Sequence, residues 1–171
     1  MVNTVVVTGV GPRTGTSYIM QQALLSGLPI LGEKFIDGYT ISEFNNNGYY
    51  DLHPEKLNEY DYNNKIIKSW YPFLSLFDSN DFSNILVLER KDKEKQQESI
   101  LKVYKEEVKL QKLSGVLSKI NPYNFIPVYE EGLNDWLKNK NKDKILRVYT
   151  EDIDSNLKNI LTFLRRGLLC H

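Results

Sequence analysis

The feature that most constrains this chain is a glycine-rich segment, residues 8–17, that follows an apolar run near the N-terminus. The β-branched run at residues 5–7 predicts a buried strand, and the apolar spacing of residues 16–25 predicts a helix. The segment between them must therefore turn the chain from a strand into a helix. Its glycines permit tight turns, and N–H groups at a helix start bind phosphate-like anions. A turn that merely reverses the chain is the alternative; an anion-binding loop is favoured.

Side chains in this segment strengthen that prediction. Arg13 supplies a guanidinium group, and Thr14, Thr16 and Ser17 supply hydroxyl groups. The segment is not a Walker A motif, G-x-x-x-x-G-K-[ST], because Val10 and Thr16 stand where that motif has glycine and lysine. In ATP- and GTP-hydrolysing proteins that lysine contacts the β- and γ-phosphates. The sequence therefore argues against ordinary ATP or GTP turnover.

Strands and helices alternate along the rest of the chain. Strands are predicted at residues 29–31, 66–68, 84–88 and 145–149, and helices at 71–77, 93–119, 125–138 and 156–164. This alternation predicts a single α/β domain over residues 1–171: a three-layer, P-loop-like fold with a mostly parallel sheet of about five strands. Ligands of such sheets bind beyond the carboxyl ends of the strands. Residues 35–62, rich in Asn, Gly, Tyr and Asp, predict a long functional loop with a helical turn after Pro54.

Composition argues against several classes of function. Of the 171 residues, 22 are basic and 22 acidic, and a net charge of zero disfavours nucleic-acid and anionic-membrane partners. Cys170 is the single cysteine, and His53 and His171 are the only histidines, so neither an intrachain disulfide nor a Cys- or His-based metal site is expected. The chain lacks an apolar run long enough to span a membrane, and its N-terminus lacks the basic start of a signal peptide. A cytoplasmic protein is expected.

Residues 12–17, Pro-Arg-Thr-Gly-Thr-Ser, resemble the P-[KR]-[ST]-G-T-[ST] loop of sulfotransferases that use 3′-phosphoadenosine 5′-phosphosulfate (PAPS). In that family the loop binds the 5′-phosphosulfate of the donor. The resemblance implies that the same contacts are made here by Pro12, Arg13, Thr14, Gly15, Thr16 and Ser17.

A second segment resembles the family's site for the donor's 3′-phosphate, where a strand ends in arginine and a serine follows on the next helix. Here Arg90 follows the predicted strand at residues 84–88, and Ser99 lies about two helical turns along the helix. Lys91 competes with Arg90 for this role, because a spacing of eight residues, common in the family, leads from Lys91 to Ser99. An arginine in a surface ion pair beside an ordinary helix serine is the alternative.

Three more stretches are similar to bacterial and tyrosylprotein-sulfotransferase-like relatives, in the same order. Residues 48–51 are similar to a G-[FY]-[FY]-E segment, residues 66–72 to a K-x-P strand end, and residues 147–164 to an R-Y-E-D-L…FL ending. The resemblance thus runs from residue 4 to about 164. One departure is Thr150, which replaces the tyrosine that precedes Glu-Asp in the family. For the acidic pair at residues 151–152, capping and ion pairing are favoured over catalysis.

The resemblance implies a reaction that needs a cation at the leaving group and a general base, but no metal ion. Lys68, at the end of a predicted strand, is the candidate cation at the bridging oxygen, with Arg13 nearby; an ordinary surface lysine is the alternative. Three residues are candidates for the base, in the order Glu33, Asp51 and His53. Glu33 comes first because it matches the first glutamate of a Gly-Glu-Glu segment in tyrosylprotein sulfotransferases.

We therefore expect a PAPS-dependent sulfotransferase that acts on a hydroxyl group of a small molecule, glycan or peptide and releases adenosine 3′,5′-bisphosphate. The sequence leaves the acceptor and the oligomeric state open. Two other functions stay open as well. One is a P-loop kinase using Mg²⁺–ATP, which the missing lysine disfavours. The other is a non-catalytic nucleotide-binding module of the same fold, which the shortness of the chain favours.

Overall fold

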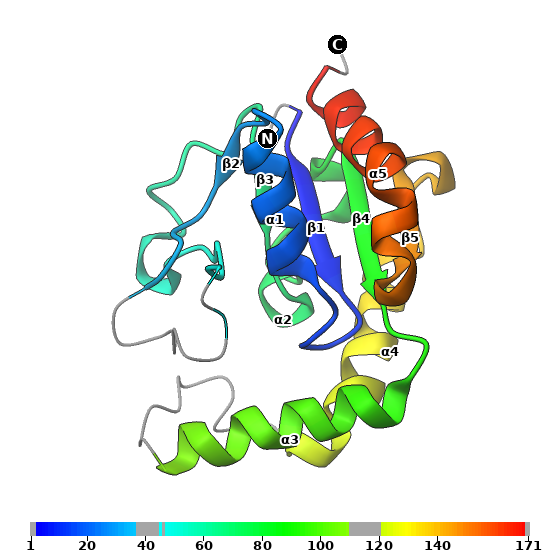
Figure 1. Cartoon of the computed structure of the whole chain (residues 1–171). Helices are drawn as coiled ribbons and strands as arrows, with labels where there is room; N and C mark the ends of the chain where they lie inside the picture. Colours follow the sequence, from blue (N-terminus) through cyan, green and yellow to red (C-terminus); the bar gives the residue numbers. More distant parts are fainter. Residues whose placement is uncertain (1–2, 37–44, 46, 110–120, 170–171) are drawn as a thin grey trace.

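Five parallel strands form the centre of the protein. The computed structural model describes residues 3–36, 45, 47–109 and 121–169, and the strands lie side by side in the order β2-β3-β1-β4-β5 (Figure 1). Every pairing between neighbouring strands is parallel. The strands are β1 (Val5–Gly9), β2 (Ile30–Leu31), β3 (Ile66–Lys68), β4 (Asn84–Glu89) and β5 (Ile145–Tyr149).

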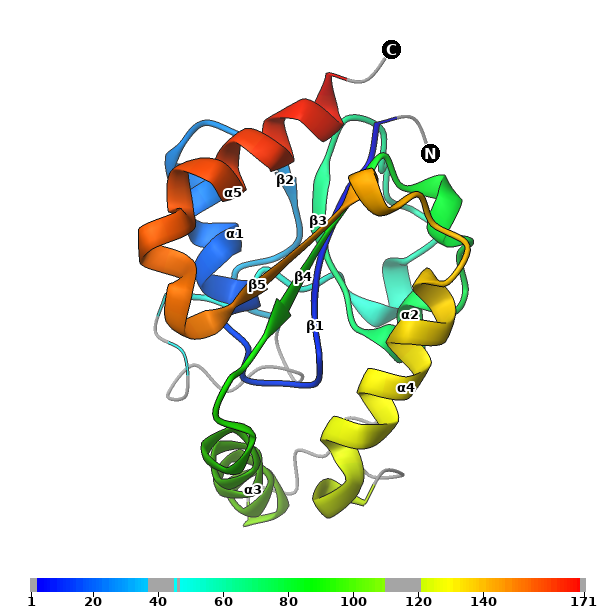
Figure 2. The same cartoon turned by 90° about the vertical axis from the view of Figure 1, so that its right-hand side faces the viewer.

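Helices cover both faces of the sheet, as Figure 2 shows. The helices are α1 (Thr16–Leu25), α2 (Tyr71–Leu74), α3 (Lys93–Lys109), α4 (Phe125–Leu137) and α5 (Ile153–Leu168). One core cluster joins α1 and α5 to the sheet through residues such as Ile19 and Ile160. The other joins α2 and α4 to the opposite face through Leu74 and Leu133. The sheet is therefore the middle layer of a three-layer α/β fold, as the sequence predicted.

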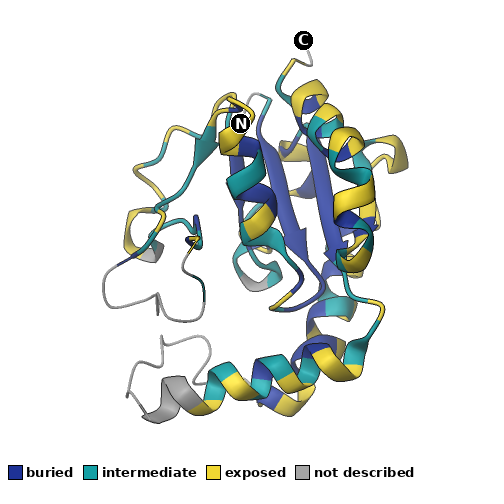
Figure 3. Ribbon diagram, in the orientation of Figure 1, coloured by how far each residue is buried: buried dark blue, intermediate teal, exposed yellow. Residues whose placement is uncertain are grey.

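The central position of β1 follows from its composition. Its three valines, residues 5–7, are fully buried (Figure 3), and their side chains alternate between the two core clusters. A strand that is apolar on both faces is stable only where helices cover both faces. The loop that follows β1 therefore leaves the middle of the carboxyl edge of the sheet, where α3 passes across it (Figure 1).

Most of the predicted elements are confirmed, and two helix lengths were wrong. Helix α2 ends at Leu74 instead of residue 77, and α5 starts at Ile153 and ends at Leu168 instead of spanning 156–164. The polar residues 154–156 concealed the first turn of α5, because they form its exposed or half-buried side. The predicted helical turn after Pro54 is a short 3-10 helix. Residues 110–119 of the predicted long helix, residues 37–44 and 46 of the predicted loop, and Cys170 and His171 lie outside the described residues.

Within the described part of the chain, no helix is both long enough and apolar enough to cross a membrane.

Gly9 is the residue at which the turn after β1 depends on the absence of a side chain. A Cβ atom there would lie 2.0 Å from Thr14 Oγ1 and 3.3 Å from the carbonyl oxygen of Leu88. We expect Gly9→Ala to lower the free energy of unfolding by about 3 kcal/mol, because the packed loop must shift to admit a methyl group. Gly27→Ala is the control: its Cβ meets nothing within 4 Å, and only the φ of +72° opposes it, at about 1 kcal/mol. Equal losses in urea unfolding would contradict this account.

Candidate functional site

The loop between β1 and α1 has the backbone of an anion-binding turn. Gly11, Arg13 and Gly15 have φ angles of 77°, 66° and 85°, all in the left-handed region. Gly15 precedes the first turn of α1, makes no side-chain cap, and is followed by no acidic residue in that turn. Thr16 is the first helical residue and is half-buried. The positive end of the helix dipole is thus not neutralised by a side chain of the helix itself.

Two side chains hold this loop in place: Gln96, which the sequence did not single out, and Thr150, which follows the predicted strand at residues 145–149. The amide nitrogen Nε2 of Gln96, a fully buried residue on α3, donates hydrogen bonds of 2.8 Å to the carbonyl oxygens of both Val10 and Pro12. The Thr150 hydroxyl lies 2.8 Å from the carbonyl oxygen of Thr14, and it is also within hydrogen-bond distance of a β4 carbonyl. These loop carbonyl groups have no hydrogen-bond partner in the strand or the helix, so the two side chains supply the donors that they need.

The sequence does contain a signal from which the anchoring role of Gln96 could have been predicted. It lies four residues before Ile100, a buried residue on the same face of α3. A polar residue at a core-facing position needs a buried hydrogen-bond partner. Such a position therefore indicates an anchor.

The two segments predicted to bind the donor meet at one hydrogen bond. Arg13 Nε donates to Ser99 Oγ at 3.0 Å, across 86 residues of sequence. Arg90 does not take part: no hydrogen bond between Arg90 and Ser99 is found, and its Nε lies 3.8 Å from a carboxylate oxygen of Glu151. The structure therefore places Ser99 beside Arg13 and places Arg90 in an ion pair, the alternative that the sequence left open.

Lys68 is buried beneath this loop, which contradicts the reading of an ordinary surface lysine. Its side chain is 2 % exposed, and its Nζ lies 2.8 Å from Asp51 Oδ1 and 3.0 Å from Ser17 Oγ. The ammonium group also lies 5.7 Å from the ring centre of Tyr49 and 6.0 Å from that of Trp70. A carboxylate, a hydroxyl and two aromatic faces thus replace the water lost on burial.

Two of the candidate bases, Asp51 and His53, lie on residues 49–53, which we call the strap, and Glu33 is paired with the strap. Of the three, only Asp51 forms an ion pair with Lys68. Glu33 and Asp51 form an isolated antiparallel bridge, with a backbone hydrogen bond of 2.8 Å from Glu33 to Asp51. The carboxylate of Glu33 lies near Tyr60 and Lys56, whereas that of Asp51 is paired with Lys68. The structure thus brings the carboxylate of Asp51 to Lys68, whereas the sequence had ranked Glu33 first as the base.

His53 has a local structural role. Its ring nitrogen Nδ1 accepts the backbone N–H of Glu55 at 3.3 Å and so caps the 3-10 helix Pro54–Lys56. A ring nitrogen that accepts an N–H is not protonated while it does so. This contact ties the His53 ring to the local structure of its own segment.

An ion-pair network surrounds the end of β4. Glu151 Oε2 accepts the backbone N–H of Lys91 at 3.1 Å, and Lys91 Nζ lies 2.7 Å from Asp152 Oδ1. Desolvation alone would raise the pKa of Glu151, but backbone N–H donors, including those of Lys91 and Asp92, outweigh it and lower that pKa. The pKa of Asp92 is also lowered, chiefly because its carboxylate accepts the backbone N–H of Lys95 at the start of α3.

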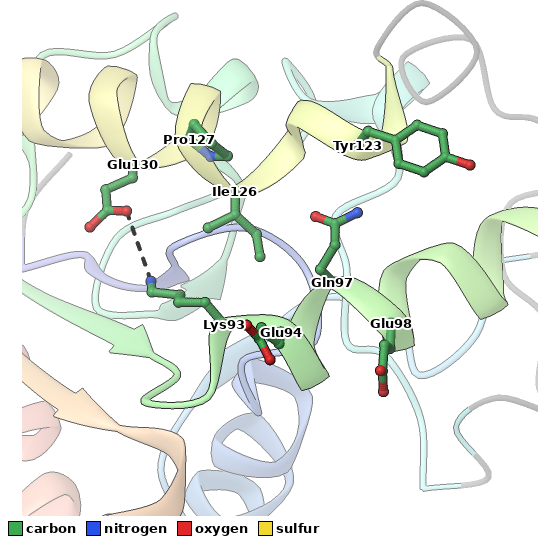
Figure 4. Close-up of a pocket in the computed structure, with 8 residues that line it drawn as sticks. All are labelled: Lys93, Glu94, Gln97, Glu98, Tyr123, Ile126, Pro127 and Glu130. Atoms are coloured by element: carbon green, nitrogen blue, oxygen red, sulfur yellow. Dashed lines mark ion pairs between the residues drawn. The ribbon is translucent and has the colours of Figure 1, made fainter.

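An open hollow of about 620 Å³ lies between α3 and α4 (Figure 4). It adjoins the loop, because Ile126 lines the hollow and would lie 3.7 Å from a Cβ atom placed on Gly11. Lys93 reaches across it towards Glu130, with 3.9 Å between Nζ and Oε2. The sequence did not predict this hollow, whose lining comes from Lys93, Glu94, Gln97, Glu98, Tyr123, Ile126, Pro127 and Glu130.

In the described part of the chain, no group of three or more His, Cys, Asp or Glu residues is arranged to hold a metal ion. The chain matches no protein-family model, no curated protein and no solved structure.

The anchoring role of Gln96 is testable by unfolding. Gln96→Leu keeps much of the side-chain volume but leaves two loop carbonyls without their donor, and we expect a loss of about 2 kcal/mol. Gln97→Leu is the matched control, because the adjacent glutamine makes its hydrogen bond to Pro122 at the open hollow and should lose less than about 1 kcal/mol. Similar urea midpoints for the two variants would contradict the anchoring role.

The ion pair of Lys68 gives a second stability prediction. Lys68→Met removes the partner of a carboxylate that is only 21 % exposed, so we expect a loss of about 2–4 kcal/mol. In the Lys68→Met/Asp51→Leu double variant the charge left behind is also removed, and the loss should be smaller than the sum of the single losses. Lys56→Met, which breaks the exposed pair with Glu33, should change stability by less than about 1 kcal/mol. Strict additivity of the Lys68 and Asp51 losses would contradict a direct pair.

Proposed function

We propose that the chain is a sulfotransferase that moves the sulfuryl group of PAPS to a hydroxyl acceptor. The observation that carries this proposal is the hydrogen bond between Arg13 and Ser99. The sequence resemblance implied two separate donor-binding segments, and these residues belong to one segment each. Their contact at the carboxyl edge of a parallel sheet is the arrangement that a single nucleotide, with anionic groups at both ends of its ribose, would need.

The loop supplies the groups for the 5′-phosphosulfate. The first N–H groups of α1 and the hydroxyl of Thr16 can donate to phosphate or sulfate oxygens, and Arg13 adds a positive charge. Arg13 is exposed, and its observed hydrogen-bond partner is the neutral hydroxyl of Ser99. A donor oxygen can therefore replace that hydroxyl without separating an ion pair.

Lys68 and Asp51 supply the chemistry in this proposal. Asp51 takes the proton from the acceptor hydroxyl as the acceptor oxygen bonds to sulfur. The bond between sulfur and the bridging oxygen breaks, and its electron pair goes to the leaving 5′-phosphate. Lys68 stabilises the charge that grows on that bridging oxygen. Because Lys68 is buried against the rings of Tyr49 and Trp70, water is kept from its ammonium group.

A P-loop kinase is the competing function that an experiment must separate from this one. In that class the hydroxyl at the position of Ser17 binds Mg²⁺. Here Ser17 Oγ accepts a hydrogen bond from Lys68 and donates one to the carbonyl oxygen of Tyr49 at 3.2 Å. This engagement, together with Thr16 in place of the motif lysine, favours a donor that binds without a metal ion.

Calorimetric titration with adenosine 3′,5′-bisphosphate tests the donor site. We expect binding without metal, and Arg13→Ala should weaken it by about 1.5–3 kcal/mol, the usual loss for a hydrogen bond to a charged group. Arg165→Ala, which removes the same charge from the last turn of α5, should leave the affinity unchanged.

Four other results would contradict the proposal. Preference for Mg²⁺–ATP would assign the chain to the kinases, and equal effects of the two arginine variants would mean that the binding depends only on net charge. If neither nucleotide binds, the loop is not a nucleotide-binding site and the proposed donor site is wrong. Where the bisphosphate does bind, the absence of sulfuryl transfer from PAPS in an acceptor screen would identify a non-catalytic binding module.

A further inference from the structure

The carboxylate of Glu151 lies where a ligand anion would be expected. It accepts the backbone N–H of Lys91 at 3.1 Å, directly after β4, and its other oxygen faces the guanidinium of Arg90. A backbone N–H at a strand end beside a guanidinium group is a typical site for a phosphate oxygen. Arg90 and Lys91 are also the two residues that the sequence resemblance left as candidates for the 3′-phosphate of the donor. The chain therefore provides its own anion at this position.

Glu151 does not satisfy Arg90 completely. Arg90 Nε is buried, and no hydrogen-bond partner for it is found among the described residues. The nearest carboxylate oxygen, at 3.8 Å, is too far for a hydrogen bond. Buried donors in native proteins are nearly always paired. A tetrahedral phosphate presents more oxygens than a carboxylate, so it could accept from Arg90 Nε and from the Lys91 amide together.

The surrounding charges allow a phosphate group to replace the carboxylate of Glu151. Glu151 is exposed, so its side chain can swing into solvent without crossing the core. Lys91 Nζ is engaged separately by Asp152 at 2.7 Å, and that pair does not depend on Glu151. Departure of Glu151 would leave Arg90 and the Lys91 amide facing an unoccupied position. An arriving phosphate group would restore the charge balance there.

We propose that Glu151 is a built-in competitor for the 3′-phosphate of the donor nucleotide, occupying its subsite at Arg90 and Lys91 until the phosphate displaces it. This inference rests on the proposed function for the identity of the nucleotide. It makes Glu151 a specificity residue: a nucleotide with only a 5′-phosphate leaves Glu151 in place, whereas a 3′,5′-bisphosphate must replace it. The returning carboxylate also favours release of the bisphosphate product.

Titration of matched variants with two nucleotides tests the competition. We expect Glu151→Gln to tighten binding of adenosine 3′,5′-bisphosphate by about fivefold to twentyfold, because the neutral amide holds Arg90 less strongly. The affinity for adenosine 5′-monophosphate should change by less than about twofold. Asp154→Asn removes the same charge three residues along the chain, where the carboxylate accepts a hydrogen bond from the Tyr18 hydroxyl, and should alter neither affinity by more than about twofold.

Inorganic phosphate provides a readout that does not depend on the nucleotide. In Glu151→Gln, added phosphate should shift the backbone amide resonance of Lys91 in an NMR titration, and the shift should be much smaller in the wild type at the same concentration. The phosphate titration distinguishes failure of the proposed function from failure of the proposed competition by Glu151. If no adenine nucleotide binds but phosphate shifts this resonance in Glu151→Gln alone, the proposed function fails and the competition by Glu151 stands.

Other outcomes would contradict the proposal that Glu151 competes with the 3′-phosphate. Equal tightening by Glu151→Gln and Asp154→Asn would show an effect of net charge alone. An unchanged or weaker affinity of Glu151→Gln for the bisphosphate would show that Glu151 does not occupy the subsite, even where Arg13→Ala confirms the donor loop. Absence of nucleotide binding together with an unshifted Lys91 resonance would overturn both proposals.

Discussion

The arrangement of the candidate site depends on how the chain leaves the buried strand β1. At Gly9 there is no room for a side chain, since a Cβ atom would overlap Thr14 Oγ1 at 2.0 Å. The turn also removes backbone carbonyls from the sheet, and these must find donors elsewhere. Gln96 and Thr150 supply them from α3 and from the segment that follows β5. Because these donors come from distant parts of the chain, the loop adopts its shape only when the whole carboxyl edge is assembled.

The same edge explains how a lysine can be buried here. Lys68 ends β3, next to β1, so its side chain emerges under the loop and not at the surface of the sheet. Asp51 and Tyr49 reach it from a strap that is held to residues 33–34 by two backbone hydrogen bonds. The strap also requires an unusual backbone, since Tyr50 has a φ of 58° while its ring is buried. A protein stores such strain where the geometry of a side chain matters more than local stability.

The fold could be predicted from the sequence because its signals are local. The apolar run of β1, the helical spacing of residues 16–25 and the turn residues between them each act over a few positions. The pairing of Arg13 with Ser99 was not predicted, because it depends on the angle at which α3 crosses the loop, which no local pattern encodes. The contact of Asp51, rather than Glu33, with Lys68 was not predicted for a similar reason. The two residues lie in the same bridge, and only tertiary packing decides which carboxylate meets Lys68.

The cations at the carboxyl edge of the sheet differ in how readily each can contact an anionic ligand, because they differ in their partners. Among the described residues, Lys68, Arg90 and Lys91 each have a carboxylate partner, namely Asp51, Glu151 and Asp152. Arg13 instead hydrogen-bonds a neutral hydroxyl, so a dianion that approaches the loop can contact Arg13 without displacing a carboxylate. The Lys68 pair is buried, whereas the Arg90 pair is partly exposed, and an exposed pair costs less to open. An anionic ligand is therefore expected to engage Arg13 first and Arg90 second, while the buried pair of Lys68 stays closed.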